Sequence, residues 1–278
     1  MSEDKLKAIV EQNKQHKVAL IGIPYDLNSS YMRGPAEAPP AIRQAFFSDS
    51  SNLWTETGID LGAEAVLLDV GDLEFDKESE PLKEIENSIM FLLDCKMLPI
   101  ALGGDHTITY PIVKAFRRKY KKMSILLFDA HPDLYHEFQG NRYSHACTFA
   151  RILESQLVDR LIQVGIRAMN GHQRAQAERF GVEVIEMRNW YEGIRFSFDS
   201  PVYVSFDMDA LDPSYAHGVS HREPGGLSVR QVISILQTLK GQVVGADIVE
   251  FNPQNDPLKL TSRVCVKLLK EIAALLLI

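Results

Sequence analysis

Residues 124–133 read SILLFDAHPD, an apolar run that leads directly into three chemically active side chains. The run is short, apolar throughout and without a helical period, which is typical of a strand buried on both faces of a parallel sheet. Seven further runs have the same character, at residues 17–24, 65–71, 98–104, 160–167, 182–187, 201–209 and 242–251. Helical patterns separate them, at residues 81–96, 109–122, 173–180 and 228–240. This alternation predicts a three-layer α/β/α sandwich with a mostly parallel central sheet, although it does not give the strand order.

The composition is that of an ordinary globular protein. The 278 residues are 45% apolar and 24% charged, enough to bury a substantial core. Because no linker-like or repetitive segment interrupts the chain, we expect a single domain over residues 1–278. The net charge of −7 and the lack of a basic stripe argue against nucleic acid as a partner, whereas an acidic surface suits a cationic substrate.

The sequence also gives indications about the cellular setting. No apolar stretch reaches the roughly 20 residues that cross a bilayer, so we expect no membrane partner. Residues 1–17 are polar and amphipathic, without the apolar core of a signal peptide. The cysteines Cys95, Cys147 and Cys265 show neither a paired nor a metal-binding spacing, which fits a reducing compartment. These features together predict a cytoplasmic protein.

Acidic and imidazole side chains gather where the predicted strands end. Asp129, His131 and Asp133 are spaced i, i+2, i+4, which places them on one side of an extended chain. Asp207 and Asp209 repeat the i, i+2 spacing after another strand. Ligands of open parallel sheets bind beyond the carboxyl ends of the strands, so these side chains are expected to meet.

A histidine at a third strand end, His106, completes a set of four carboxylates and two imidazoles. Such a set without thiolates favours a fairly hard divalent metal such as Mn²⁺, with Co²⁺, Ni²⁺ or Zn²⁺ as alternatives. More carboxylates than one ion needs predict two ions that share aspartate oxygens and activate a water nucleophile. The fitting substrate carries an electrophilic carbon in a cationic group. The neighbouring Asp105 is instead expected to cap the next helix.

Four motifs resemble, in order and spacing, those of the ureohydrolase family of arginases, agmatinases and their relatives: GGDHT (103–107), DAHPD (129–133), SFDMDALDP (205–213) and VGADIVEFNP (244–253). The resemblance extends from about Val18 to the C-terminus. Two more segments look especially like plant-type arginases and their bacterial relatives: YSHACTFARI (143–152) and GVSHREPGGLS (218–228).

The resemblance implies a binuclear manganese site and names its ligands. One Mn²⁺ would be held by His106, Asp129, Asp133 and Asp207. The other would be held by His131, Asp129, Asp207 and Asp209, so that Asp129 and Asp207 bridge. The family also forms trimers or hexamers, so a homo-oligomer is expected.

The resemblance further implies the hydrolysis of a small guanidino substrate to urea and an amine. Glu250 matches the acid that pairs with the guanidinium through charge-assisted hydrogen bonds. His145 matches the proton-shuttling histidine, which protonates the leaving amine. The other reading is a catalytically inert, metal-binding relative. His136 and Glu137 are expected to be loop residues rather than ligands, because the metal set is complete without them.

The substrate tail distinguishes L-arginine from agmatine, because only arginine carries a carboxylate. Arg142, in the segment GNRYSHA (140–146), and Arg222 would place positive charge near the mouth of the site, which favours a carboxylate tail. His221 is a second candidate for a substrate contact. We therefore expect an arginase, while agmatine, other guanidino acids and guanidine remain open as substrates.

Overall fold

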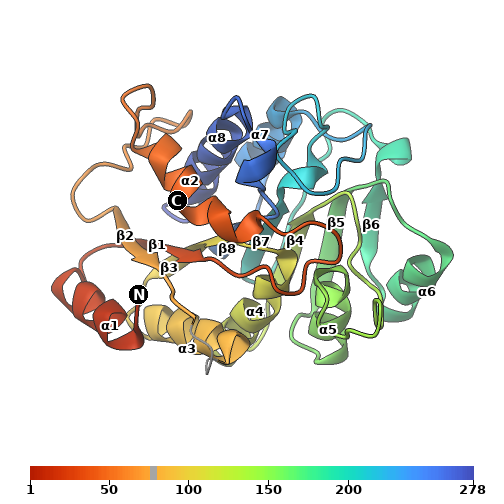
Figure 1. The fold of residues 1–278 in the computed structure, drawn as a ribbon, viewed down its shortest axis with the longest axis horizontal. Helices are drawn as coiled ribbons and strands as arrows, with labels where there is room; N and C mark the ends of the chain where they lie inside the picture. Colours follow the sequence, from red (N-terminus) through yellow and green to blue (C-terminus); the bar gives the residue numbers. More distant parts are fainter. Residues whose placement is uncertain (76–79) are drawn as a thin grey trace.

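A sheet of eight parallel strands runs through the middle of the molecule with helices on both faces, in a computed structural model that describes residues 1–75 and 80–278 (Figure 1). Its strands are β1 (Val18–Ile23), β2 (Leu67–Asp72), β3 (Leu98–Gly103), β4 (Ser124–Phe128), β5 (Arg160–Ile166), β6 (Glu183–Glu186), β7 (Val202–Asp207) and β8 (Val243–Val249). Every pair of neighbouring strands is parallel. The predicted three-layer α/β/α architecture is therefore confirmed.

Helices cover the two faces of the sheet in separate groups (Figure 1). One face carries α2 (Ala38–Phe46), α7 (Val229–Thr238) and α8 (Leu260–Leu275). The other carries α1 (Glu3–Gln12), α3 (Pro81–Asp94), α4 (Thr109–Lys119), α5 (Thr148–Glu154) and α6 (Gly171–Phe180). Strands β1, β4, β7 and β8 are buried along their whole length, because apolar helix faces pack on both sides of them. The continuous apolar runs of the sequence reflect this double burial.

Two of the helices that were not predicted from the sequence, α2 and α5, were missed for local reasons. Helix α2 contains Pro39 and Pro40, which usually interrupt a helical pattern, but both lie in its first turn, where no backbone donor is lost. Helix α5 has only seven residues, too few to show a period. The predicted start of α6 was late by two residues, because Asn170 caps the helix in a capping box with Gln173.

The strand order decides which loops meet. It is β2-β1-β3-β8-β7-β4-β5-β6, so the four motif-bearing strands β3, β8, β7 and β4 lie side by side at the centre. The registers pair Phe128 with Phe206 and Asp207 with Val249, so these strands end at nearly the same level. Their polar carboxyl-terminal loops therefore converge on one place at the edge of the sheet.

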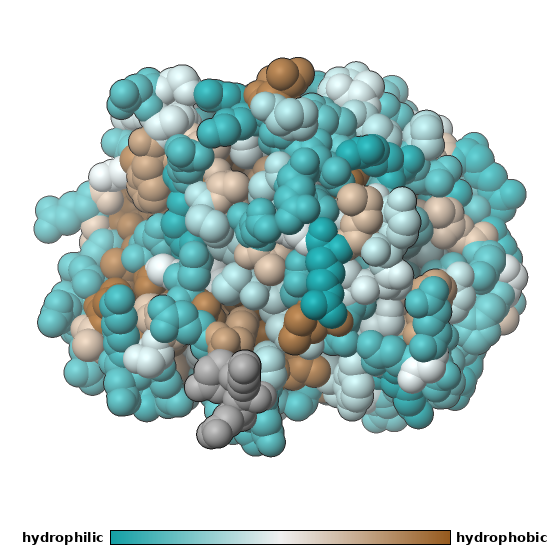
Figure 2. Space-filling view, in the orientation of Figure 1, coloured by the Kyte–Doolittle hydropathy of each residue, from teal (hydrophilic) through white to brown (hydrophobic). Residues whose placement is uncertain are grey.

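The outer surface seen in Figure 2 is mostly hydrophilic, with scattered apolar residues between the charged ones. Such isolated apolar residues are normal for a folded chain in water. Among the described residues, no helix combines the length and the apolar character that a membrane crossing requires.

Candidate metal centre and catalytic cavity

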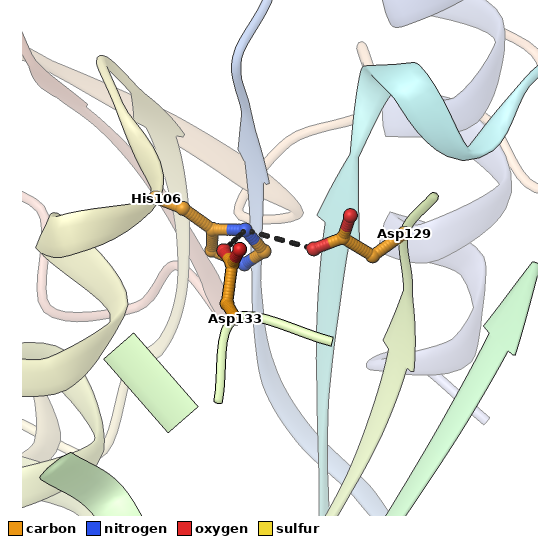
Figure 3. A group of neighbouring side chains, drawn as sticks. All are labelled: His106, Asp129 and Asp133. Carbon is orange, nitrogen blue, oxygen red and sulfur yellow. Dashed lines mark ion pairs between the residues drawn. The ribbon is translucent and has the colours of Figure 1, made fainter. Parts of the chain in front are cut away.

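His106 is the centre of the first group of predicted metal ligands. Its Nδ1 atom lies 3.2 Å from one oxygen each of Asp129, Asp133 and Asp207. Figure 3 shows His106, Asp129 and Asp133 pointing toward one another from the loops that follow β3 and β4. All four side chains are buried. The structure thus brings together His106 and Asp207, which lie 101 positions apart in the chain.

His131 is the centre of the second group. Its Nδ1 atom lies 3.0 Å from Asp209 Oδ2 and 3.6 Å from Asp129 Oδ1. Asp129 therefore directs Oδ2 toward His106 and Oδ1 toward His131. One carboxylate with an oxygen in each group is the arrangement expected of a ligand that two ions share.

The charges of the two groups perturb one another strongly. Burial opposes a charge on His106, but the surrounding carboxylates, Asp129 first, raise its pKa well above the usual range. Burial opposes a charge on His131 too, yet Asp209 raises its pKa to about 12. Burial and neighbouring carboxylates raise the pKa of Asp129 to about 6, and that of Asp207 well above its usual range. The excess of buried negative charge thus requires positive charge nearby, which protons or cations could supply.

These residues fit a divalent cation. Among the described residues, the buried atoms His106 Nδ1 and Asp129 Oδ2 have no hydrogen-bond partner, and a buried polar atom left in that state is costly. Two trios of residues offer such donor atoms, one containing His106 and the other His131, and Asp129 belongs to both. Within each trio, the donor atoms lie within 4.8 Å of one another. Ligand atoms about 3 Å apart have the spacing found around an ion with bonds of roughly 2.1 Å. A cation would also replace the protons that the histidines otherwise hold.

A buried chain of hydrogen bonds fixes the orientation of His106 from behind. Ser205 Oγ donates to Asp247 Oδ1 over 2.7 Å, so its own lone pair is free to accept from His106 Nε2 over 3.0 Å. Tyr203 and Thr109 donate to the other oxygen of Asp247. In the neutral ring that a metal ion would bind, the proton therefore lies on Nε2, and the Nδ1 lone pair faces the carboxylates. Outer partners of this kind orient metal-binding histidines.

The Ser205→Ala variant tests this chain of hydrogen bonds. We expect the affinity for Mn²⁺ to fall about 10–100-fold, because His106 loses the acceptor that holds its tautomer. Competition with a fluorescent chelator measures the affinity without relying on turnover. Ser124→Ala is a matched control. This buried serine of β4 pairs with Ser200 and takes no part in the hydrogen bonds around His106. Equal affinities of Ser205→Ala and wild type would contradict the assignment.

A cavity of about 210 Å³ lies directly over the two groups. Its lining includes the predicted residues His131, Asp133, His145, Asp207, Asp209, His221 and Glu250, together with Ser30, Tyr135, Phe138, Ala146, Ala168 and Gln173. Carboxylates of both groups contribute to the lining, together with aromatic rings and the amide of Gln173. The cavity is therefore small enough to enclose a small molecule against the cluster.

Glu250 and His145 form an ion pair in this cavity. Glu250 Oε1 lies 2.7 Å from His145 Nδ1 and also accepts a hydrogen bond from the backbone N–H of His106. Burial opposes the charge on each partner, but the pairing raises the pKa of His145 to about 9 and lowers that of Glu250. Among the described residues Glu250 Oε2 has no partner, so it is free to bind a cation.

Two residues of the site have a backbone conformation that is rare outside glycine. Asp133 has a φ of 50° and Glu250 a φ of 63°. Such left-handed conformations cost free energy and occur where the surrounding structure holds a side chain in a required direction. The folded chain thus directs both carboxylates toward the cavity.

Of the side chains predicted to contact the substrate tail, His221 lines the cavity and Arg142 does not. The ring of His221 lies 5.7 Å from that of His131 and 5.6 Å from that of His145, on the cavity wall. Arg142, in contrast, does not line the cavity: its guanidinium is half exposed and lies 3.0 Å from Glu154. Arg222 is exposed and donates to the carbonyl of His217. Arg142 therefore gives no support to a carboxylate tail, whereas Arg222 lines a neighbouring hollow together with His131 and His221, beside the cavity.

Several nearby polar residues lie outside the cavity. His136 is exposed and pairs with Glu154, and Glu137 is exposed as well. His217 pairs with Asp256 at the start of α8. Asp105 caps the short 3-10 turn that begins at His106, by accepting from the backbone N–H of Thr107.

Ser30, Ser205 and Asp247 are parts of the site that the sequence analysis missed. Ser205 shares the i, i+2 spacing with Asp207 and could have been found from that signal. Asp247 appeared only as a polar interruption of an apolar strand. Ser30 lies in a loop with no recognisable pattern, and only the fold places it beside His145.

Known proteins resemble this chain over most of its length. The model of the arginase family matches residues 16–274. "Arginase 2, chloroplastic/mitochondrial" from Arabidopsis thaliana is 45% identical, covering 92% of this chain and 79% of its own length. "N(1)-aminopropylagmatine ureohydrolase" from Thermus thermophilus is 38% identical, covering 86% of this chain and 84% of its own. The solved structure "Arginase from Medicago truncatula" superimposes with a TM-score of 0.91 at 41% identity, over 98% of this chain and 93% of that one.

The comparisons correct one prediction. The cytoplasmic location inferred from the sequence is wrong, because the names of plant relatives assign them to mitochondria or chloroplasts. Composition and cysteine spacing reflect the redox state that a protein experiences, and they do not distinguish the cytoplasm from the interior of an organelle.

Proposed function

The chain belongs to the arginase family, and on this basis we propose that it hydrolyses the guanidinium group of L-arginine to urea and L-ornithine. The observation that carries the proposal is Asp129, whose two oxygens face two histidine-centred groups next to the cavity that holds the Glu250–His145 pair. A ureohydrolase needs a place for metal ions, an acid for the guanidinium and a proton donor for the leaving amine. The cavity offers residues for all three.

We assign the metal ligands as follows. His106, Asp129, Asp133 and Asp207 would hold one Mn²⁺, and His131, Asp129, Asp207 and Asp209 would hold the other. The hard carboxylate and imidazole donors support Mn²⁺, and would also accept Co²⁺, Ni²⁺ or Zn²⁺. When bound, the ions supply Lewis acidity and an activated water nucleophile.

The protein side chains orient the substrate and transfer a proton. Glu250 Oε2 accepts charge-assisted hydrogen bonds from the guanidinium, while Oε1 stays bound to His145 and to the backbone of His106. His145 holds a proton on Nδ1, beside the position that the guanidinium occupies, and donates it to the leaving amine. The ring of His221 forms part of the cavity wall, and we propose that it contacts the substrate.

The choice of arginine rests on the relatives rather than on the charge of the cavity. The plant relatives near 45% identity are named arginases. Agmatine or a similar polyamine precursor is the second candidate, because no lysine or arginine is among the residues that line the cavity in the described part of the chain. A relative at 38% identity is named for an aminopropylagmatine substrate.

Urea release tests the function and its substrate together. After loading with Mn²⁺, the protein is assayed with arginine, agmatine, guanidinobutyrate and guanidine at equal concentrations. We expect the highest kcat/KM for arginine. A higher value for agmatine would overturn the choice of substrate, and no urea from any of the four would support an inert, metal-binding relative.

We also propose that residues 1–278 form one domain and that the chain assembles as a homo-oligomer. The single eight-stranded sheet supports the first statement. The family resemblance, with its trimers and hexamers, supports the second. Light scattering would distinguish these states from a monomer.

A further inference from the structure

Ser30 holds the nitrogen of His145 that Glu250 does not contact. Its hydroxyl Oγ lies 2.8 Å from His145 Nε2, and its backbone N–H donates to the same nitrogen over 3.1 Å. His145 is only 7% exposed, and protein groups contact both of its ring nitrogens. Ser30 is half-buried and lines the cavity.

The groups that contact His145 favour different protonation states of its ring. A backbone N–H is always a donor, so its contact requires a lone pair on Nε2 and leaves the proton of the neutral ring on Nδ1. The Glu250 carboxylate, in contrast, favours the doubly protonated ring, in which Nε2 also carries a hydrogen. Only the serine hydroxyl adapts to either state of Nε2, because it donates to an Nε2 lone pair and accepts from an Nε2–H.

The loop that carries Ser30 is fixed on both sides of it. The backbone N–H of Asn28 donates to Asp105, and the carbonyl of Asn28 accepts from the backbone N–H of His145. Asp26 accepts from the backbone N–H of Gly34. The hydroxyl is therefore held beside His145 before any substrate binds, without a large loss of conformational freedom on binding.

We propose that Ser30 is a positioning residue of the hydrolytic reaction, whose hydroxyl holds the Nε2 atom of His145 in both protonation states of the ring. The inference rests on the proposed function, because it gives His145 the task of protonating the leaving amine. When Nδ1 releases its proton to that amine, the N–H bond breaks and a new amine N–H bond forms. The remaining ring proton on Nε2 stays hydrogen-bonded to Ser30 Oγ.

Other ionisable groups around His145 also influence its pKa. Glu250 forms the ion pair, and Asp105 and Asp133 add further negative charge nearby. His221 packs against the ring and opposes its charge. None of these groups changes in a variant of Ser30, so a change in the pH dependence reports on the hydroxyl.

The Ser30→Ala and Ser30→Thr variants test the proposal in the Mn²⁺-loaded enzyme. In Ser30→Ala only the backbone donor faces Nε2, which disfavours the charged ring. We expect kcat to fall about 10–100-fold with KM nearly unchanged, the size of a lost hydrogen bond to a charged group. The alkaline limb of the kcat profile, where His145 loses its proton, should move to lower pH by about one unit. Ser30→Thr keeps the hydroxyl and should restore both.

Controls separate this proposal from the function on which it rests. Ser29→Ala removes the neighbouring hydroxyl, which contacts Asp105 rather than His145, and should leave kcat within about two-fold. With an active wild type, three results would each overturn the role of Ser30: an unchanged kcat in Ser30→Ala, a change in KM alone, or an equal loss in Ser30→Thr. An inactive wild type would refute the proposed function itself.

Discussion

The Asp129→Asn variant is expected to release no measurable urea and to bind less metal. An amide offers one oxygen where the carboxylate offers two, and Asp129 directs one oxygen to each histidine-centred group. The nitrogen of the amide would face one of the two ions and could not bind it. If the metal ions stabilise the transition state by several kcal/mol less, kcat decreases by roughly 10³-fold or more.

Metal content measured on the purified variant by mass spectrometry distinguishes this cause from misfolding. Asn has the shape of Asp but no charge, so the buried cluster loses like-charge repulsion and the chain should stay folded. Asp94→Asn, at an exposed position at the end of α3, controls for the handling of the protein and should retain metal and activity. Activity near that of wild type in Asp129→Asn would refute the shared-ligand assignment.

The strands and the chemistry at their ends could be predicted because both depend on local sequence. A strand buried on both faces must be apolar throughout, which the run before Asp129 displays directly. Side chains after such a strand lie at the carboxyl edge of a parallel sheet whatever the strand order. His106, Asp129 and Asp207 could thus be grouped before the order β3-β8-β7-β4 was known.

The misplaced Arg142 shows what local sequence cannot give. The arginine was expected at the mouth of the site because it lies in the segment GNRYSHA (140–146), which also contains His145. Its partner Glu154 lies on α5, a helix too short to be predicted, and the ion pair turns the guanidinium away from the cavity. The direction of a long, charged side chain depends on which opposite charge the fold brings within reach.

The polar residues behind the cluster were missed for a different reason. Asp247 lies inside an apolar strand, where a carboxylate is costly unless it is fully hydrogen-bonded. Its donors Tyr203, Ser205 and Thr109 come from two other elements, so the compensation is invisible in the sequence. A buried charge within an otherwise apolar strand is itself a signal, and here it marks the support of His106.

The Glu250→Gln variant is expected to lose about 10²–10³-fold in kcat/KM for guanidino substrates, since charge-assisted hydrogen bonds contribute about 1.5–3 kcal/mol each. A glutamine oxygen can still accept from the backbone of His106 and from His145, so the shape of the site is kept while the charge is removed. Glu250 is not among the proposed metal ligands. The metal content should therefore equal that of wild type, in contrast to Asp129→Asn.

The pH profile of Glu250→Gln adds a second readout. Despite burial, the Glu250 carboxylate contributes to raising the pKa of His145 to about 9, and a neutral amide withdraws that contribution. Because the proton donor must be charged to act, the alkaline limb of kcat should move to lower pH. Glu86→Gln changes a buried glutamate of α3 that pairs with Lys114 of α4; it is the matched control and should change neither quantity. If Glu250→Gln kept the kcat/KM of wild type, the guanidinium would have to bind elsewhere in the cavity.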